Sequence, residues 1–101
     1  MFYNSEKLKN INELKYLNTK YINNFSYMFN GCSSLSIIKS LEKWNVSNCN
    51  NFEAMFHLCS SLSDIKSLEK WNVSNYNIFD GMFNECASSL SDINLLNTFN
   101  Q

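Results

Sequence analysis

A stretch of eight residues that recurs letter for letter constrains this chain more than any other feature. Leu41 to Asn48 reads Leu-Glu-Lys-Trp-Asn-Val-Ser-Asn, and the same letters return at residues 68–75. Between residues 41–59 and 68–86, thirteen of nineteen positions are identical. A Met-Phe pair followed by a cysteine recurs at the same 27-residue step, at Met28-Phe29 with Cys32, Met55-Phe56 with Cys59, and Met82-Phe83 with Cys86. Such a period predicts stacked units that bury their apolar faces against their neighbours.

The length of 101 residues corresponds to one repeat domain of just under four units. We expect residues 1–22 to form an N-terminal cap or degenerate repeat, followed by repeats at 23–48, 49–75 and 76–101, the last incomplete. A cap with repeat ancestry is favoured, because four apolar residues near the N-terminus stand 27 positions before apolar residues of the next unit. Leu8, Ile11, Leu14 and Leu17 correspond in this way to Leu35, Ile38, Leu41 and Trp44.

The residues around each Met-Phe pair have helical spacing. Phe25, Met28, Phe29 and Cys32 fall at i, i+3, i+4 and i+7, which predicts one face of a short helix that is repeated in the next two units. A further short helix is predicted over Ser5 to Asn18, with Ser5 as its N-cap.

Between these helices we expect extended chain and tight corners. The Leu-Ser-x-Ile segments beginning at Leu35 and Leu62 predict short extended pieces that stack in parallel, and Lys39 to Trp44 predicts a single helical turn. Abundant Asn is expected to replace Gly at left-handed corners. The fold class is therefore an α/β solenoid. Because strands stack more closely than helices, we expect the stack to curve and to offer a concave surface.

Composition narrows the function classes. The net charge of −1 argues against nucleic acid as a partner, and no apolar run approaches the length that spans a membrane. Met1 to Asn10 lacks the apolar core of a signal peptide, which indicates a soluble, unexported chain. The chain stops at Leu96, Phe99 and Gln101 without a polar capping face. This open apolar end predicts truncation, a partner, or end-to-end self-association.

The cysteines allow two interpretations. Cys32, Cys59 and Cys86 share one register position, so they could form a metal site or disulfides, or a buried column of small apolar side chains. Their spacing matches no zinc signature, and copies on stacked helices would lie too far apart for bridging. We therefore expect a buried column, with Cys49 as a further packing residue.

The remaining candidates for chemistry favour structural roles. His57 is the single histidine, and its register equivalents are Asn30 and Asn84, so a solvent-facing position is favoured over a catalytic triad. An aromatic column is expected in the core; it consists of Leu17, Trp44, Trp71 and Phe99. We identify no catalytic, cofactor-binding or metal-binding residue.

Charged residues in register are the candidates for partner binding. Lysine and glutamate recur at three positions of the second and third units, where they form either a solvated face or a docking strip for a protein partner. These residues are Lys39, Glu42, Lys43, Lys66, Glu69 and Lys70.

The repeated motif resembles a known family. Trp44 to Asn48, then Met55-Phe56, then Cys59 to Leu62 are similar to the BspA-type leucine-rich repeat, also described as a domain of unknown function in mycoplasma lipoproteins. The resemblance extends from Leu14 to Phe99. It implies a leucine-rich-repeat-like solenoid and a surface or secreted protein engaged in adhesion or host contact.

These observations together predict a non-catalytic protein-interaction module of the leucine-rich-repeat type, engaged in surface adhesion or host contact. The alternative is an intracellular protein-binding scaffold or recognition module that uses the same concave face. An enzyme would require clustered ionisable residues that break the repeat, and His57 is the only such departure.

The Met-Phe column can be tested by removing one ring. Phe56→Ala is expected to lower the free energy of unfolding by about 3–5 kcal/mol, because it removes a core ring and leaves a cavity. The total free energy of unfolding of a small domain is only about 5–15 kcal/mol, so the variant should be largely unfolded. Denaturant titration measures the loss, and an unchanged midpoint would exclude this column from the core.

Overall fold

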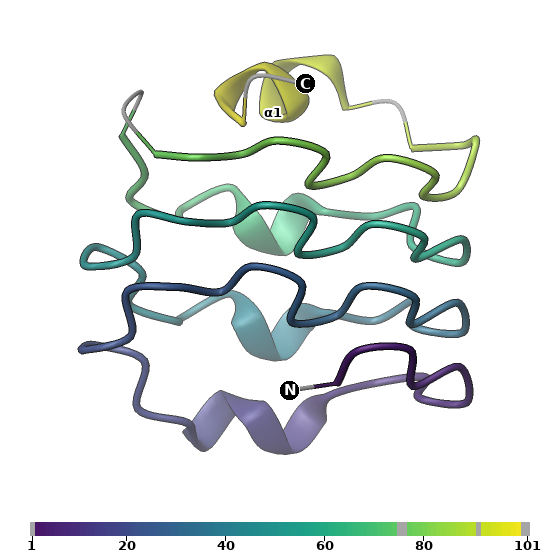
Figure 1. The fold of residues 1–101 in the computed structure, drawn as a ribbon, viewed down its shortest axis with the longest axis horizontal. Helices are drawn as coiled ribbons and strands as arrows, with labels where there is room; N and C mark the ends of the chain where they lie inside the picture. The colour runs from purple at the N-terminus through teal and green to yellow at the C-terminus, as the bar shows by residue number, and fades with distance from the viewer. Residues whose placement is uncertain (1, 75–76, 91, 100–101) are drawn as a thin grey trace.

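The 27-residue step of the sequence is also the step of the fold. In a computed structural model, which describes residues 2–74, 77–90 and 92–99, equivalent segments of successive units lie one above another from the N-terminus to the C-terminus (Figure 1). The radius of gyration is 12.2 Å and the principal extents are 29 × 28 × 19 Å, so the chain is compact. Regular secondary structure is sparse, and the described residues contain no sheet.

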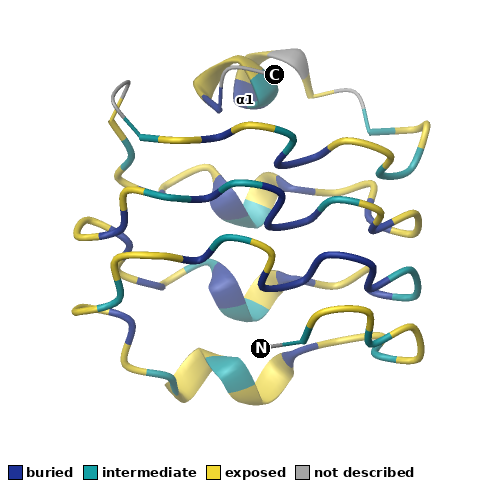
Figure 2. Ribbon diagram, in the orientation of Figure 1, coloured by how far each residue is buried: buried dark blue, intermediate teal, exposed yellow. Residues whose placement is uncertain are grey.

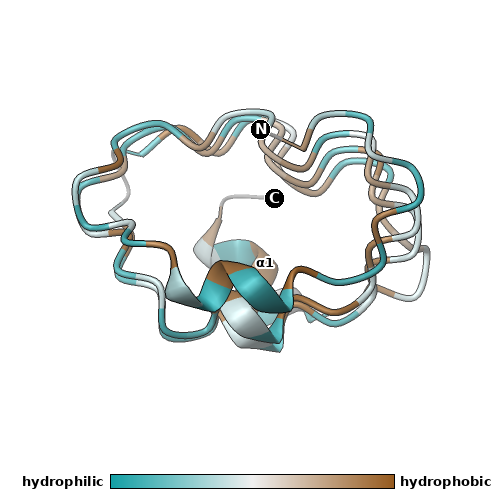
Figure 3. Ribbon diagram, turned by 90° about the horizontal axis from the view of Figure 1, so that it is seen from below, coloured by the Kyte–Doolittle hydropathy of each residue, from teal (hydrophilic) through white to brown (hydrophobic). Residues whose placement is uncertain are grey.

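The helices are short and lie on one long side of the molecule. Among the described residues, three are 3-10 helices and the fourth is an α-helix near the C-terminus. Seen along the stack, they face the Met-Phe segments (residues 25–32, 52–59 and 79–86) across the interior (Figure 3). The helices are η1 (Asn12–Tyr16), η2 (Lys39–Leu41), η3 (Lys66–Leu68) and α1 (Ile93–Thr98).

The helices predicted around the Met-Phe pairs are absent, because their backbone N–H groups alternate between two kinds of partner. Every second N–H bonds three residues back and closes a tight turn, as from Met28 to the Phe25 carbonyl. The others donate to the carbonyl 26 positions ahead, over 2.8–2.9 Å, from Phe25, Tyr27, Phe29 and Gly31 and again from Phe52, Ala54, Phe56 and Leu58. Helices of two turns are too short to compete with this bonding between units.

Left-handed backbone accompanies this pattern. Two register positions, four residues apart, have φ between +51° and +78°. One holds Asn4, Gly31, Leu58 and Glu85, and the other holds Tyr27, Ala54 and Gly81. A helix cannot contain such residues, which explains the failure of the helical prediction. The expectation that Asn fills left-handed corners is also wrong for these two positions, since only Asn4 does so.

Asn instead bonds its own turns, as expected from its side chain. Five asparagine Oδ1 atoms accept a hydrogen bond from the N–H two residues ahead, at distances of 2.8–3.4 Å. They belong to Asn10, Asn18, Asn24, Asn45 and Asn51.

The other predicted elements are partly confirmed. The helical turn expected at Lys39 is η2, and its copy is η3. The helix expected over Ser5 to Asn18 is only η1, which has no side-chain cap, so Ser5 is not its N-cap. The Leu-Ser-x-Ile segments form no strand among the described residues. Isolated parallel bridges join successive units instead, at Asn10–Ile37, Asn24–Asn51 and Asn51–Ile78.

The core consists of columns of like side chains running along the stack. Buried stretches of the ribbon recur at equivalent places in successive units (Figure 2). Phe2, Phe29, Phe56 and Phe83 stack with ring centroids 5.5–5.7 Å apart and planes within 12° of parallel. A second column runs through Phe25, Phe52 and Phe79 at 5.5–6.2 Å. These separations suit offset aromatic stacking. Trp44 and Trp71 form a third column, and both are buried, which confirms their predicted place in the core.

The predicted open apolar end is closed by one aromatic residue. Phe99 meets Phe79 and Phe83 edge to face, with both centroid distances at 5.5 Å. It is fully buried, and the two rings beneath it are buried as well. These three rings are therefore not exposed at this end of the stack, and end-to-end self-association stays a prediction.

The two glycines allow a matched test of the left-handed positions. Gly31→Ala and Gly81→Ala each place a Cβ on left-handed backbone, at a cost of about 1–2 kcal/mol. At Gly31 the new Cβ also overlaps Asn4 Oδ1 and lies 3.2 Å from the Asn4 Cα, whereas at Gly81 the nearest atom is Asn84 Nδ2 at 3.5 Å. Gly31→Ala is therefore expected to destabilise the fold more. Equal midpoints in thermal or denaturant unfolding would contradict this packing.

Candidate functional site

The six charged residues predicted for partner binding lie on one side of the molecule. All belong to η2 and η3 or to the two residues that follow each helix, and five of the six are exposed, while Glu42 is half-buried. Because η1, η2 and η3 contact one another in sequence, their outer residues form a continuous surface. We call this surface the charged strip; it comprises Asn12, Lys15, Tyr16, Lys39, Glu42, Lys43, Lys66, Glu69 and Lys70.

Three shallow depressions follow one another along the charged strip. The η1–η2 groove, of about 490 Å³, is lined by Asn12, Lys15, Tyr16, Lys39, Ser40, Glu42 and Lys43. The η2–η3 groove, of about 310 Å³, is lined by Lys39, Glu42, Asp64, Lys66, Ser67, Glu69 and Lys70. The η3–α1 groove, of about 410 Å³, is lined by Lys66, Glu69, Asp92, Asn94, Leu95 and Thr98.

One ion pair orders the centre of the charged strip. Lys39 Nζ lies 2.8 Å from Glu42 Oε2, one helical turn away. Their hydrogen bond lowers the pKa of Glu42 and raises the pKa of Lys39. Both groups are solvated, so this pair orients the two side chains and contributes little to stability.

The first unit completes the charged strip with residues that the sequence analysis did not single out. Asn12, Lys15 and Tyr16 stand 27 positions before Lys39, Glu42 and Lys43. Extending the repeat register back through η1 would have identified them. The side chain of Tyr16 is 81% exposed, and Lys15 Nζ lies 5.0 Å from its ring centroid.

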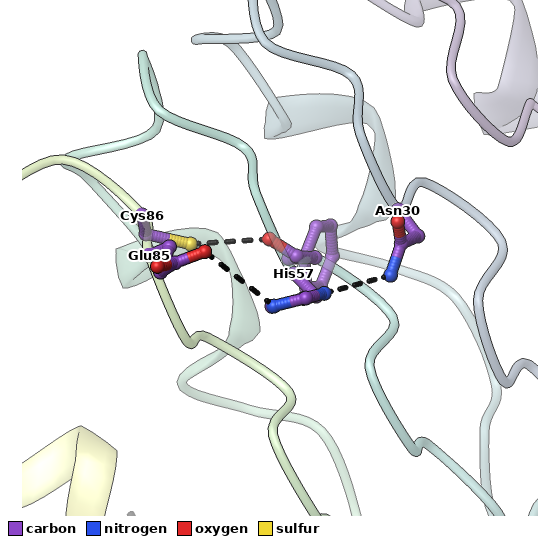
Figure 4. Close-up of polar contacts among 5 residues, drawn as sticks. Asn30, His57, Glu85 and Cys86 are labelled. Atoms are coloured by element: carbon purple, nitrogen blue, oxygen red, sulfur yellow. Dashed lines mark hydrogen bonds and ion pairs between the residues drawn. The ribbon is translucent and has the colours of Figure 1, made fainter.

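His57 lies on the opposite side, in a different environment from the predicted helix surface. Its Nδ1 lies 3.0 Å from Asn30 Nδ2, and its Nε2 lies 3.8 Å from Glu85 Oε2 (Figure 4). Asn30 is buried, so its amide needs a partner, and His57 provides one. The histidine therefore links three successive units.

The cysteine column has a bonding role that the sequence did not predict. Each thiol lies 3.1–3.2 Å from a carbonyl oxygen 30 positions earlier, from Cys32 to Phe2, Cys59 to Phe29 and Cys86 to Phe56. The predicted burial is confirmed for Cys32, Cys59 and Cys49, while Cys86 is half-buried, and all four thiols are free. Burial raises the pKa of each thiol, that of Cys86 to about 12. Protonated thiols are poor nucleophiles and metal ligands.

Other kinds of site find little support in the described part of the chain. No group of three or more His, Cys, Asp or Glu side chains there is arranged to hold a metal ion. None of the helices described above has the length and apolar character required to cross a bilayer.

Comparison with known proteins identifies one family. The family described as "Mycoplasma protein of unknown function, DUF285" matches residues 1–101. No curated protein and no solved structure shows a match to this chain.

The raised thiol pKa values predict a loss of stability at alkaline pH. The unfolded chain releases these protons near pH 8.5, whereas the folded chain holds them to higher pH, to about 12 for Cys86. The contribution of the protonated thiols to the free energy of unfolding is thus fully present below about pH 8.5. Above that pH it falls, by up to about 1.4 kcal/mol per pH unit for each thiol.

Cys59→Ser separates this effect from the titration of other groups, because serine keeps a donor that does not titrate. Denaturant titrations between pH 7.5 and 10 should give a shallower decline for the variant than for the parent. Parallel declines would exclude Cys59 as a source of the pH dependence.

Proposed function

We propose that this chain, which belongs to the DUF285 family of mycoplasma proteins of unknown function, is a non-catalytic protein-interaction module that binds a protein partner along the charged strip. The observation that carries the proposal is the alignment of the charged residues in register on one side. Seven charged side chains of the strip, an exposed tyrosine and three consecutive grooves lie on this side. A long, shallow surface of this kind suits a macromolecular partner better than an enclosed small molecule.

The state of the reactive groups also favours binding over catalysis. The three thiols of the cysteine column are used as donors to backbone carbonyls, and burial keeps them protonated. His57 is held by Asn30 at one ring nitrogen and faces Glu85 at the other. Neither arrangement resembles an activated nucleophile beside a base.

We further infer that the fold is a short solenoid of the BspA-type leucine-rich-repeat kind. Support comes from the 27-residue step of the bonds between units and from the stacked aromatic columns. Within this interpretation, the repeat motif that resembles surface proteins favours a role in adhesion or host contact.

An intracellular scaffold is the second candidate, and one observation favours it. All four cysteines are free thiols, as is usual in a reducing compartment. Labelling intact producing cells with a membrane-impermeant reagent, followed by mass spectrometry of this chain, separates the two locations. Labelled lysines on intact cells would support adhesion, whereas labelling only after lysis would support the scaffold.

The binding surface can be tested by site-specific photo-crosslinking. A photoreactive residue in place of Ser67, which lines the η2–η3 groove, is expected to capture a partner in the producing cells. The matched control places the same residue at Asn84, which is exposed on the side of the Met-Phe segments.

A discrete crosslinked protein at position 67 that is weak or absent at position 84 would support the proposal. Capture at 84 alone, or equal capture at both positions, would move the interface away from the charged strip. An absence of crosslinks at 67, with the chain folded and expressed, would contradict the proposal.

A further inference from the structure

Charge is distributed unevenly along the chain. Residues 1–50 contain six lysines and three acidic residues, a net charge of +3, whereas residues 51–101 contain two lysines and six acidic residues, a net charge of −4. Because the units lie one above another in chain order (Figure 1), the two ends of the stack carry opposite charge. Such separation produces a field that orients charged partners.

The same gradient runs along the charged strip. The η1–η2 groove has three lysines against one glutamate, a net charge of +2. The η2–η3 groove has three lysines against three acidic residues and is neutral. The η3–α1 groove has one lysine against two acidic residues, a net charge of −1. A partner that follows the strip therefore meets a positive end, a neutral centre and a negative end.

The positive charge of the η1–η2 groove is largely uncompensated. Its only acidic residue, Glu42, is paired with Lys39 at 2.8 Å. Lys15 and Lys43 have no ion pair among the residues that the structure describes. Tyr16 lines the same groove, with Lys15 Nζ 5.0 Å from its ring centroid, and offers an aromatic surface that is 81% exposed. Two unpaired ammonium groups beside an exposed ring form a site for carboxylate groups with adjoining apolar carbon.

We propose that the η1–η2 groove binds an acidic peptide segment of the partner protein, with its carboxylates on Lys15 and Lys43 and its backbone or side chains against Tyr16. This inference rests on the proposed function and adds the chemistry of the partner. It also fixes the orientation, since the acidic segment must lie at the η1 end and its less acidic or basic continuation over η3 and α1.

The far end of the strip selects a peptide over a uniformly charged polymer. A nucleic acid or an acidic polysaccharide that starts in the η1–η2 groove would continue over the η2–η3 groove, where lysines no longer exceed acidic residues. Over the η3–α1 groove, where Glu69 and Asp92 outnumber Lys66, its charges would meet a net repulsion. A polypeptide can change sign along its length, so it can match the whole gradient.

Fluorescence anisotropy with a labelled glutamate-rich peptide tests this inference on the full chain. The peptide is expected to bind, its glutamine analogue to bind much more weakly, and rising salt to weaken the interaction. Lys15→Gln and Lys43→Gln are each expected to weaken binding about two- to fivefold, as usual for an exposed charge pair.

A second Lys-Tyr pair outside the charged strip supplies matched controls. Lys20→Gln removes an exposed lysine that lines none of the three grooves and should leave affinity unchanged. Tyr16→Ala should weaken binding. Tyr21→Ala should not, although Tyr21 is 76% exposed and Lys20 lies 5.4 Å from its ring, because Tyr21 lies outside the groove.

Three outcomes would overturn the inference. Equal loss in Lys43→Gln and Lys20→Gln would indicate attraction to positive charge without a site. Tighter binding of an oligonucleotide of the same charge would favour a phosphate ligand. Concentration-dependent dimerisation that Lys43→Gln abolishes would make the occupant a second copy of this chain. If any of these occurs while position 67 still captures a partner, the charged strip remains the interface and only the acidic segment is wrong.

Discussion

The backbone bond from one unit to the next is the interaction on which the rest of the structure depends. Every second N–H group of the first two Met-Phe segments donates to the unit that follows, as from Phe29 to the Met55 carbonyl at 2.9 Å. This bonding fixes the spacing of the aromatic columns, aligns the short helices on the far side and brings the charged residues into register. It also holds left-handed backbone at residues such as Ala54 and Leu58, which an isolated peptide would avoid.

The sequence predicted the periodic features of this fold better than the local ones. Burial of Phe25, Met28 and Phe29 followed from the apolar spacing, and η2 followed from the repeated Lys-Ser-Leu motif. The prediction of helices at the Met-Phe pairs was wrong. Successive tight turns that contain two left-handed residues bury side chains at the same sequence spacing as one face of a helix would. Residue propensities did not indicate the left-handed backbone, since Tyr and Leu have no preference for positive φ. The φ angles of Tyr27 and Leu58 are set by bonds to other units.

The candidate site was predictable to the extent that it repeats. The charged residues of η2 and η3 were found from their register, and the structure places them together on one side. Tyr16 and Lys15 were missed because the first unit differs in sequence, although their positions follow from the same step. The ion pair between Lys39 and Glu42 depends on a helical turn that the sequence did suggest. The bond from Cys59 to the Phe29 carbonyl spans two units, and no local pattern indicates it.

The constant step between units has a consequence for how the chain folds. The bonds that join neighbouring units, from backbone, tryptophan and cysteine donors, connect residues 25–30 positions apart. Each unit therefore closes a loop of nearly the same length as it docks, and the entropy cost of closure depends only weakly on small changes in that length. Each added unit closes one more loop of this length and leaves the length of the other loops unchanged. Assembly should thus proceed by successive equal steps from whichever neighbouring pair docks first.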